Sequence, residues 1–233
     1  MSADNKRLSK FFKDNWVITL FSTMFGVIAG LYLTDYYEDQ QLNRSKLSAL
    51  EMVKQEIANN KETLSTYDSI CRSIYDKSSY VFSKMNTNKE IFVSKDSVEV
   101  FKSKSDGIIE DLEFESSSTY TDKLRVRGDM NMFVGSKLAL VDLNDVIWKS
   151  YKQTNYVNVT DFSCITSIEE LYQFQTKNNA TNSDWMDYLM QGHFLRGEEE
   201  LAEFMFKWVK ALEMNEILLN AYNNIEVIFE DCK

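Results

Sequence analysis

The chain offers few residues of the kinds that carry out catalysis. His193 is the only histidine among 233 residues, so a Ser-His-Asp arrangement would depend on it. No GxSxG segment accompanies it, and the neighbouring Phe194 and Leu195 indicate a helix end or a turn. An isolated histidine is far more often a surface or capping residue than a catalytic base. We therefore predict no catalytic residue, and we do not expect an enzyme.

Metal and cofactor sites are also not indicated. HExxH, P-loop, GxGxxG, SxxK and EF-hand patterns do not occur in a supporting context. The segment Asp142-Leu143-Asn144-Asp145 begins like a calcium loop, but it lacks the glycine and the closing glutamate and is better read as a helix-capping turn. The pair Glu169-Glu170 could serve a glycosidase, although such pairs are usually solvated helix faces. We expect no metal ligands and no cofactor.

The cysteines place few constraints on the protein. Cys71, Cys164 and Cys232 are far apart and odd in number. Because no CxxC pair exists, neither a zinc ribbon nor a thioredoxin-type redox site can be built from adjacent thiols. At least one thiol is unpaired within a monomer, and it is either buried or joined to another molecule.

The strongest pattern in the chain is an uncharged stretch at residues 16–34. Its nineteen residues would form a helix of about 28 Å, close to the roughly 30 Å hydrocarbon core of a bilayer. A signal peptide cleaved after Ala29 is the alternative, but the apolar run continues through Leu33, beyond the usual signal-peptide core. We expect a retained transmembrane helix.

Small residues recur within this span. Ser22, Gly26 and Gly30 are four residues apart and therefore share one helix face. Such a face permits close packing with a second transmembrane helix, from another membrane protein or from a second copy of the chain. The alternative is that glycine and serine are simply common in membrane helices.

The charges on either side of the span predict its orientation. Four basic residues precede the span and three acidic residues follow it: Lys6, Arg7, Lys10 and Lys13, then Asp35, Glu38 and Asp39. Cytoplasmic flanks carry the excess of lysine and arginine, so residues 1–15 are expected in the cytoplasm and residues 35–233 outside it. Residues 1–15 contribute +2 to a net charge of −10, which leaves −12 for the remainder. A chain this acidic disfavours nucleic acid as a partner.

Composition and periodicity predict a mainly α fold. The chain has no proline and seven glycines, so the strongest helix breakers are rare. The transmembrane helix is predicted to continue to about residue 85, and a last long helix to cover 198–230. Each carries an apolar seam with alternating steps of three and four residues: Leu50, Val53, Ile57, Asn60, Leu64, Tyr67, Cys71 and Ile74 in the first, and Phe204, Trp208, Ala211, Asn215, Leu218, Tyr222, Ile225 and Phe229 in the second.

Each seam contains one asparagine, which predicts how the two helices meet. If they pack antiparallel with Asn60 opposite Asn215, every apolar seam residue faces another apolar one, and the asparagines fix the register. Cys71 and Cys232 would then lie too far apart to form a disulfide. A parallel dimer of the first helix is the alternative arrangement.

The elements between these helices are predicted less sharply. Residues 86–89 indicate a turn and 90–103 a helix. Period-two alternation at 112–115 and 124–127, around a Ser/Thr loop at 116–121, is typical of a small β-hairpin. Further helices are predicted at 138–151, at 164–175 and from Ser183 to Met190, with loops at 155–163 and 178–182.

The N-terminal third resembles a group of known proteins. The segment Phe11-Phe12-Lys13-Asp14-Asn15-Trp16, the span with Gly26 and Gly30, and Glu56-Ile57 with Asn59-Asn60 resemble uncharacterised bacterial single-pass inner-membrane proteins. The resemblance covers roughly the first seventy residues. It implies a short cytoplasmic N-terminus, one membrane helix and a helical periplasmic domain, but no particular activity.

Three functions are compatible with these patterns. The first is a membrane-anchored helical scaffold, or an accessory subunit of a membrane complex, with the bilayer and another membrane protein or a second copy as partners. The second is a periplasmic helical-bundle sensor or ligand-binding module, although fifteen N-terminal residues leave little room for a cytoplasmic output domain. The third is an exported hydrolase, which the missing motifs disfavour.

Overall fold

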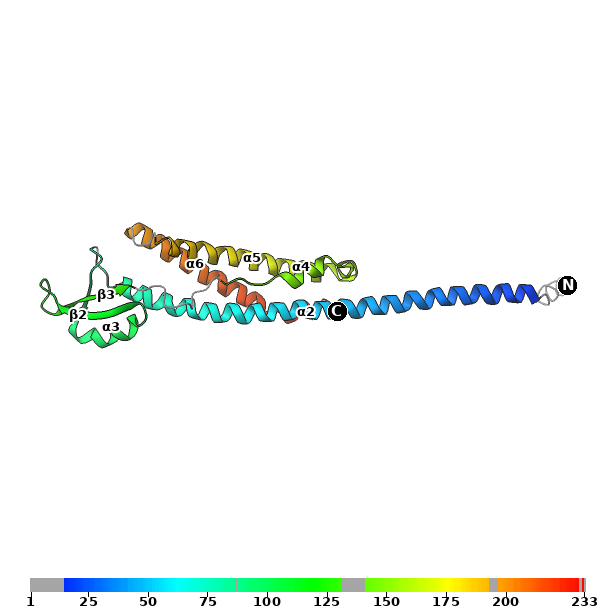
Figure 1. Ribbon diagram of the computed structural model, residues 1–233, viewed down its shortest axis with the longest axis horizontal. Coiled ribbons are helices and arrows are strands. Elements are labelled where there is room, and N and C mark those ends of the chain that lie inside the picture. The colour runs from blue at the N-terminus through cyan, green and yellow to red at the C-terminus, as the bar shows by residue number, and fades with distance from the viewer. Residues whose placement is uncertain (1–14, 87, 131–140, 193–196, 231, 233) are drawn as a thin grey trace.

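The structure of the chain, a computed structural model, describes residues 15–86, 88–130, 141–192, 197–230 and 232. One helix runs almost the whole length of the molecule (Figure 1). Two further long helices lie along its second half, and a small sheet lies at the end farthest from the N-terminus. The predicted mainly α architecture, with long N-terminal and C-terminal helices, is confirmed.

The long helix is α2, Asn15–Phe82, with 68 residues. Its continuity follows from its composition, because it contains no proline and its only glycines are Gly26 and Gly30. The prediction of one helix that continues past residue 34 is confirmed, and the helix ends three residues before the expected Met85.

The helical bundle consists of the second half of α2 together with α5, Phe162–Met190, and α6, Glu198–Asn223. Helices α5 and α6 form a hairpin, and Lys207 of α6 pairs with Asp184 of α5 at 2.8 Å. Arg72 of α2 contacts Glu216 of α6, whereas Lys54 of α2 contacts Glu226 of the short helix α7, Ile225–Glu230, which follows α6. Because the residue number of the partner rises as the position on α2 falls, α2 and these C-terminal helices run in opposite directions where they touch.

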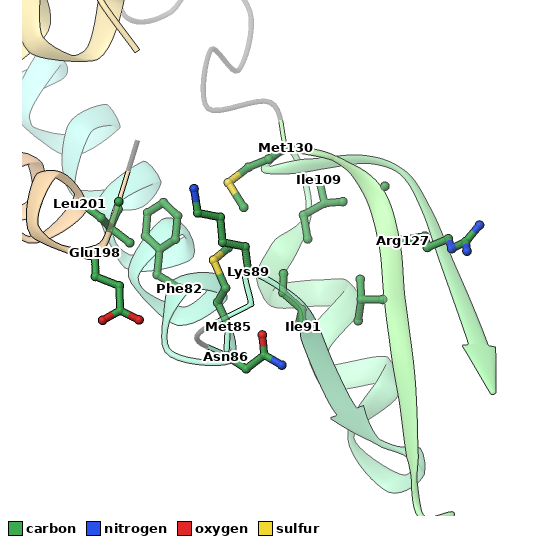
Figure 2. Close-up of a pocket in the computed structure, with 13 residues that line it drawn as sticks. Phe82, Met85, Asn86, Lys89, Ile91, Ile109, Arg127, Met130, Glu198 and Leu201 are labelled. Carbon is green, nitrogen blue, oxygen red and sulfur yellow. The ribbon is translucent and has the colours of Figure 1, made fainter. Parts of the chain in front are cut away.

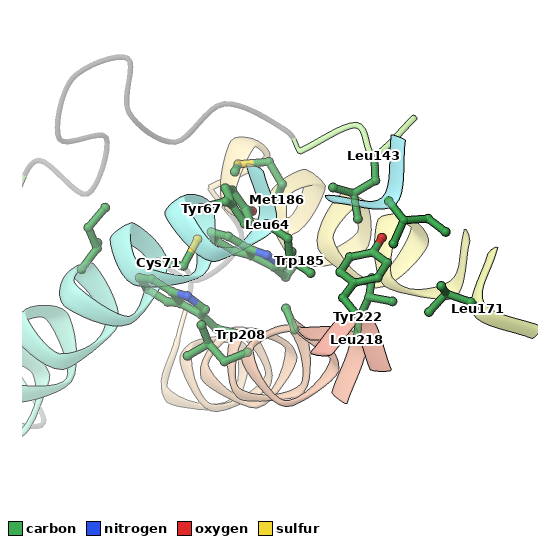
Figure 3. Packing of buried hydrophobic residues seen from close by; sticks show 14 of the residues in the cluster. Leu64, Tyr67, Cys71, Leu143, Leu171, Trp185, Met186, Trp208, Leu218 and Tyr222 are labelled. Carbon is green, nitrogen blue, oxygen red and sulfur yellow. The ribbon is translucent and has the colours of Figure 1, made fainter. Parts of the chain in front are cut away.

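Both predicted seams lie in the interior of the bundle. Every residue of the two seams is buried, including Asn60 and Asn215. Aromatic rings fill much of the space: Trp185 of α5 stacks on Trp208 of α6 with ring centroids 5.1 Å apart. Figure 3 shows Leu64, Tyr67 and Cys71 of α2 directed at these rings. A pair of such rings buries far more apolar surface than an aliphatic pair, so this contact is a main source of stability.

The small sheet has three antiparallel strands in the order β1-β3-β2. They are β1, Ile91–Ser94, β2, Ile109–Ser116, and β3, Lys123–Met130. The predicted hairpin is confirmed as β2 and β3.

The helix predicted at 90–103 is wrong in its first half. The chain forms β1, then the short 3-10 helix η1, Lys95–Ser97, and only then α3, Val98–Ser105. Ile91 and Val93 alternate into the interior, and this pairing against β3 outweighs the local helical spacing. Phe101 of α3 is fully buried against Phe114 of the sheet.

Two more predictions in the middle of the chain need correction. Helix α4 is Val146–Lys152, shorter than the predicted 138–151: residues 141–145 are not helical, and 138–140 lie outside the described residues. The loop predicted at 155–163 contains the 3-10 helix η3, Asn155–Val159. The last helix is interrupted at Asn224, after which α7, Ile225–Glu230, continues.

The polar loop predicted at 178–182 is also wrong, because α5 is continuous through it. The side chains of Asn178 and Asn182 are fully buried and hydrogen-bonded within the bundle. Asparagine usually favours turns, because its side chain competes for backbone hydrogen bonds. Here both side chains have partners within the bundle, so their burial in a helix is not penalised. Ser183, predicted as a helix N-cap, is therefore in the middle of a helix.

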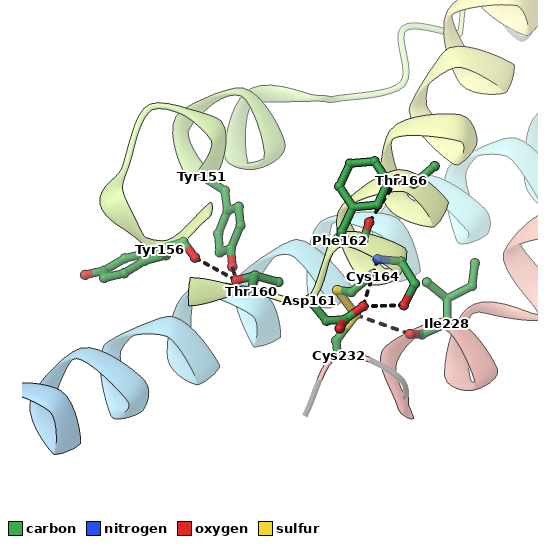
Figure 4. The surroundings of a disulfide bond; sticks show 10 residues. Tyr151, Tyr156, Thr160, Asp161, Phe162, Cys164, Thr166, Ile228 and Cys232 are labelled. Atoms are coloured by element: carbon green, nitrogen blue, oxygen red, sulfur yellow. Dashed lines mark hydrogen bonds between the residues drawn. A yellow bond between two sulfur atoms is a disulfide. The ribbon is translucent and has the colours of Figure 1, made fainter. Parts of the chain in front are cut away.

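A disulfide joins Cys164 and Cys232, whose Cα atoms are 5.1 Å apart. It connects the start of α5 to the end of the chain beyond α7 (Figure 4). The expectation that Cys71 and Cys232 do not bridge is confirmed. Cys71 is the unpaired thiol and is buried, and burial raises the pKa of Cys71 to about 12, so the folded protein holds it as an unreactive thiol.

Removal of this disulfide should lower stability. For Cys232→Ser in the full chain, we expect the free energy of unfolding in urea to fall by about 2–4 kcal/mol, because the unfolded chain loses a cross-link over a long loop. A reductant should destabilise the wild type by a similar amount and leave Cys232→Ser unchanged. Cys71→Ala serves as the control, since it should keep its sensitivity to reductant. Equal stability of Cys232→Ser and the oxidised wild type would contradict this assignment.

Candidate functional site

The first candidate site is the apolar segment of α2, residues 16–34. Every described side chain from Ile18 to Thr34 is exposed, including large apolar ones such as Phe25 and Leu31. Within the part of the chain that the structure describes, α2 is the one helix long and apolar enough to cross a membrane, and its most apolar stretch is not covered by protein. Leu50 is the first residue of α2 that is buried among the described side chains.

The small-residue strip, Ser22, Gly26 and Gly30, lies on this uncovered segment. A Cβ atom added at either glycine would meet nothing within 4 Å, so the backbone there is open to close approach by another helix. At about 100° of rotation per residue, the strip points roughly away from the face of α2 that carries Leu50, Val53 and Ile57. A second helix on the strip would therefore approach α2 from the side opposite the bundle.

The second candidate site is a buried network of amide side chains, which begins at Asn60. Asn60 Nδ2 donates to the backbone oxygen of Asn144 at 2.7 Å and to Gln175 Oε1 at 3.1 Å. The backbone N–H of Asn144 donates back to Asn60 Oδ1 at 2.9 Å. Gln175 Nε2 also donates to the oxygen of Leu143 at 2.9 Å, and Tyr222 donates to Gln175 Oε1 at 2.7 Å. These side chains hold the non-helical backbone at Leu143 and Asn144 against the bundle.

Asn215 belongs to a separate part of the network. Its Nδ2 donates to Asp68 Oδ1 at 3.2 Å, and its Oδ1 accepts from Asn178 and Asn182 at 2.8 and 2.9 Å. Asp68 in turn accepts from Arg72 Nε at 2.7 Å. Each side-chain oxygen and nitrogen atom named here has a partner, which a buried amide cluster requires.

The predicted pairing of Asn60 with Asn215 is therefore wrong. Asn215 meets Asp68, which lies eight residues, about two helical turns, farther along α2 than Asn60. Both asparagines are buried in the seams as expected, but α5 supplies Gln175 to one and Asn178 to the other. Sequence analysis missed Asn178 and Asn182 as partners because it placed them in a loop.

A buried carboxylate also organises the middle of the chain. Glu56 accepts from the backbone N–H groups of Ile147 and Trp148 at 2.9 and 3.3 Å, and from the Tyr172 hydroxyl at 2.6 Å. The Trp148 ring stacks on Tyr172 with centroids 5.8 Å apart. Burial, and next the Glu56 carboxylate, raise the pKa of Tyr172, so its hydroxyl stays protonated and remains a donor. The arrangement fixes the start of α4.

Neither network resembles a catalytic or metal site. No group of three or more histidine, cysteine, aspartate or glutamate residues that could hold a metal occurs among the described residues. The segment at 142–145, which resembles a calcium loop in sequence, instead offers its backbone to Asn60 and Gln175. His193 lies outside the described residues.

The third candidate site is a cavity of about 770 Å³ at the end of the molecule farthest from the N-terminus. It lies between the end of α2, the sheet and the first turn of α6 (Figure 2). Among the described residues, seven apolar side chains line it: Phe82, Met85, Ile91, Ile109, Val126, Met130 and Leu201. Sequence analysis could not find it, because its lining is drawn from distant segments with no shared local pattern.

Comparisons with known proteins add no further constraint. No family model matches the chain, and no curated protein or solved structure is similar to it. The functional argument therefore depends on the geometry of the chain itself.

The amide network should be essential for stability. Asn215→Ala would leave Asp68, Asn178 and Asn182 without their shared partner, so we expect the free energy of unfolding to fall by about 2–4 kcal/mol. The matched control is Asn220→Ala, an exposed position on the same helix, which should change it by less than about 0.5 kcal/mol. Urea denaturation of the two variants provides the measurement. Similar changes in both variants would show that the network does not account for the loss, because alanine has the higher helix propensity at either position.

Proposed function

We propose that the protein is a membrane-anchored scaffold or accessory subunit of a membrane complex, without catalytic activity. The observation that carries this proposal is the division of α2, whose residues 18–34 are apolar and exposed while its second half forms a wall of the bundle. An exposed apolar surface of this length is unfavourable in water and favourable in a bilayer. The helix would cross the inner membrane of a bacterium once.

The flanking charges and the disulfide favour one orientation. The basic residues before the span would stay in the cytoplasm, which places residues 35–233 in the periplasm. The Cys164–Cys232 disulfide supports this orientation independently, since structural disulfides form in oxidising compartments. In this arrangement α2 rises from the membrane as a continuous helix and carries the bundle beside it.

The interaction role is supported by the structural use of the buried polar groups and by the open small-residue strip on the anchor. The buried polar groups of the amide network are engaged in holding helices and backbone together, which is a structural role. The small-residue strip is open and points away from the bundle. A second copy or a different single-pass protein could pack there without contact between the large domains.

A ligand-binding module of the same topology is the second candidate function. The apolar cavity favours it, because its volume lies within the usual range for small-molecule sites. The cavity is about 70 Å from the end of the span, by the rise of α2 from Thr34 to Phe82. A ligand there would be sensed at the far end of the periplasmic domain.

Membrane insertion is tested by alkaline extraction of membranes and by mass spectrometry of the mature protein. The full chain should remain in the membrane pellet at high pH, and its mass should include residues 1–34. The double variant Phe25→Arg and Ile28→Arg should move to the soluble fraction, since each arginine at the centre of a span costs about 2.5–3.5 kcal/mol. The control pair Gln41→Arg and Ser48→Arg, beyond the span, should stay in the pellet. A shortened mature protein would instead show a cleaved signal peptide.

Orientation is tested by cysteine labelling in a Cys71→Ala background. A cysteine at the exposed position Glu62 should react with a membrane-impermeant maleimide on spheroplasts. A cysteine that replaces Ser2 should react only after the membrane is permeabilised. Labelling in the reverse order would overturn the proposed topology.

The strip is tested by bulky substitution. Gly26→Leu and Gly30→Leu should weaken association with a second copy or with a co-purifying partner, on the order of tenfold, because the helix backbones can no longer approach closely. Met24→Leu, on the opposite face of the same segment, is the control. Co-migration in mild detergent, measured over a range of protein concentrations, distinguishes the two faces. Unchanged association in both glycine variants would exclude the strip as the contact.

A further inference from the structure

The end of the bundle that lies nearest to the N-terminus of α2 is formed by the chain around η3. Figure 1 shows this connection between α4 and α5 at that end, and η3 contacts α2. The side chains of α2 at 35–39 are exposed, and Leu42 is the first apolar residue beyond the proposed span that is half-buried. At a rise of about 1.5 Å per residue, the bundle therefore begins about 12 Å beyond Thr34.

The η3 loop, residues 153–160, presents an uncharged surface. Lys152 and Asp161 flank it, but none of its eight residues is charged. Val159 is 41% exposed, and Phe162, just beyond the loop, is 83% exposed, the highest value among the large apolar side chains that the structure describes. Charged groups lose the most hydration free energy on leaving water, so a surface of this composition enters a less polar medium at low cost.

Tyr156 is the aromatic residue of the η3 loop. Figure 4 shows its ring extending along α2 toward the N-terminal part of that helix. The backbone of Tyr156 is fixed, because its oxygen accepts from Thr160 Oγ1 at 2.7 Å and its N–H donates to Thr154 Oγ1 at 3.3 Å. Tyrosine is enriched at membrane surfaces, because its ring is apolar and its hydroxyl is polar. Tyr156 therefore has both the chemistry and the direction of a residue that meets lipid head groups.

The remaining distance from the η3 loop to the bilayer is small. Each head-group layer is about 5–7 Å thick, half the difference between the whole bilayer and its hydrocarbon core. With Thr34 at the edge of the hydrocarbon, about 5–7 Å separate the start of the bundle from the head groups of an upright protein. Membrane helices tilt by about 20° on average, and such a tilt lowers a bundle that lies about 8–10 Å to one side by about 3 Å. The Tyr156 side chain extends across the rest.

We propose that the η3 loop is a second lipid contact of the protein, with Tyr156 and Val159 in the head-group layer of the bilayer that α2 crosses. This contact rests on the proposed anchor and adds the direction in which the anchor tilts, which is toward the bundle. The tilt and rotation of a single span are set by the groups at the membrane surface and by packing. The contact therefore holds the small-residue strip in one orientation, on the side of α2 opposite the bundle.

The test measures the depth of single labelled positions in vesicles of phosphatidylcholine that contain the purified full chain. In a Cys71→Ala background, bimane is attached to Asn158→Cys in the loop, to Phe25→Cys in the span, or to the control Arg44→Cys. Arg44 is exposed on the face of α2 that carries the small-residue strip and lies about 15 Å beyond the span. Its height is therefore similar to that of the loop, and its side is opposite.

Lipids that carry a nitroxide quench bimane at short range and so report contact. A nitroxide on the head group should quench bimane about twofold or more strongly at Asn158→Cys than at Arg44→Cys, because the tilt lowers one side and raises the other. A nitroxide in the middle of the acyl chain should quench it at Phe25→Cys. Quenching at Phe25→Cys, with the loop no more quenched than Arg44→Cys, would overturn the lipid contact and leave the loop to a protein partner or to water. No quenching at Phe25→Cys would overturn the anchor, and this proposal with it.

A charge placed in the loop provides a second readout. In vesicles that include phosphatidylglycerol, Asn155→Glu should lower the head-group quenching at Asn158→Cys about twofold, because anionic head groups repel a carboxylate. Asn155 is exposed, so the melting temperature should stay the same. Asn155→Gln is the neutral control and should keep the quenching. Equal quenching in the two variants would contradict contact between the loop and the lipid.

Discussion

The arrangement of the bundle depends on hydrogen bonds between amide side chains that are sealed inside it. An apolar seam determines which face of a helix is buried, but similar apolar residues repeat along it and permit several registers. A buried amide costs free energy unless its partners are in place, so only one register satisfies Asn215, Asp68 and Asn178 together. The second part of the network, around Asn60 and Gln175, fixes the backbone at 143–144 in the same way. The network therefore selects one packing among several that the apolar residues alone would allow.

The buried faces of α2 and α6 could be predicted from the sequence, because a seam with steps of three and four residues identifies the buried face of a helix regardless of its partner. All members of both predicted seams are buried. The register between α2 and α6 could not be predicted, because it depends on side chains of α5. Helix α5 carries a third seam with the same steps of three and four residues: Ile168, Leu171, Gln175, Asn178, Asn182, Trp185 and Leu189. Three of its members are amides, at positions that apolar residues fill in most of the other two seams. The polar character of those amides hid a periodicity that was present.

Other features had no local signal at all. The partners of the disulfide are 68 residues apart, so only the fold can bring them together. In the same way, β1 is a strand because β3 pairs with it, although its residues also fit a short helix. The cavity is assembled from α2, the sheet and α6, and the positive φ angle of Lys89 is a tertiary outcome. The cavity could therefore be found only in three dimensions, whereas the candidate membrane span could be found from hydropathy alone.

The disulfide gives the molecule a particular mechanical layout. Cys164 and Cys232 close a covalent ring that contains nearly all of α5, the whole of α6 and α7. A pulling force applied between the first residues of α2 and the C-terminus would pass from α2 through α4 to Cys164 and leave directly through Cys232. The ring would carry none of that tension, so the α5–α6 hairpin could keep its shape while the segments before it were stretched. If a partner attaches at the C-terminus, the load bypasses the α5–α6 hairpin.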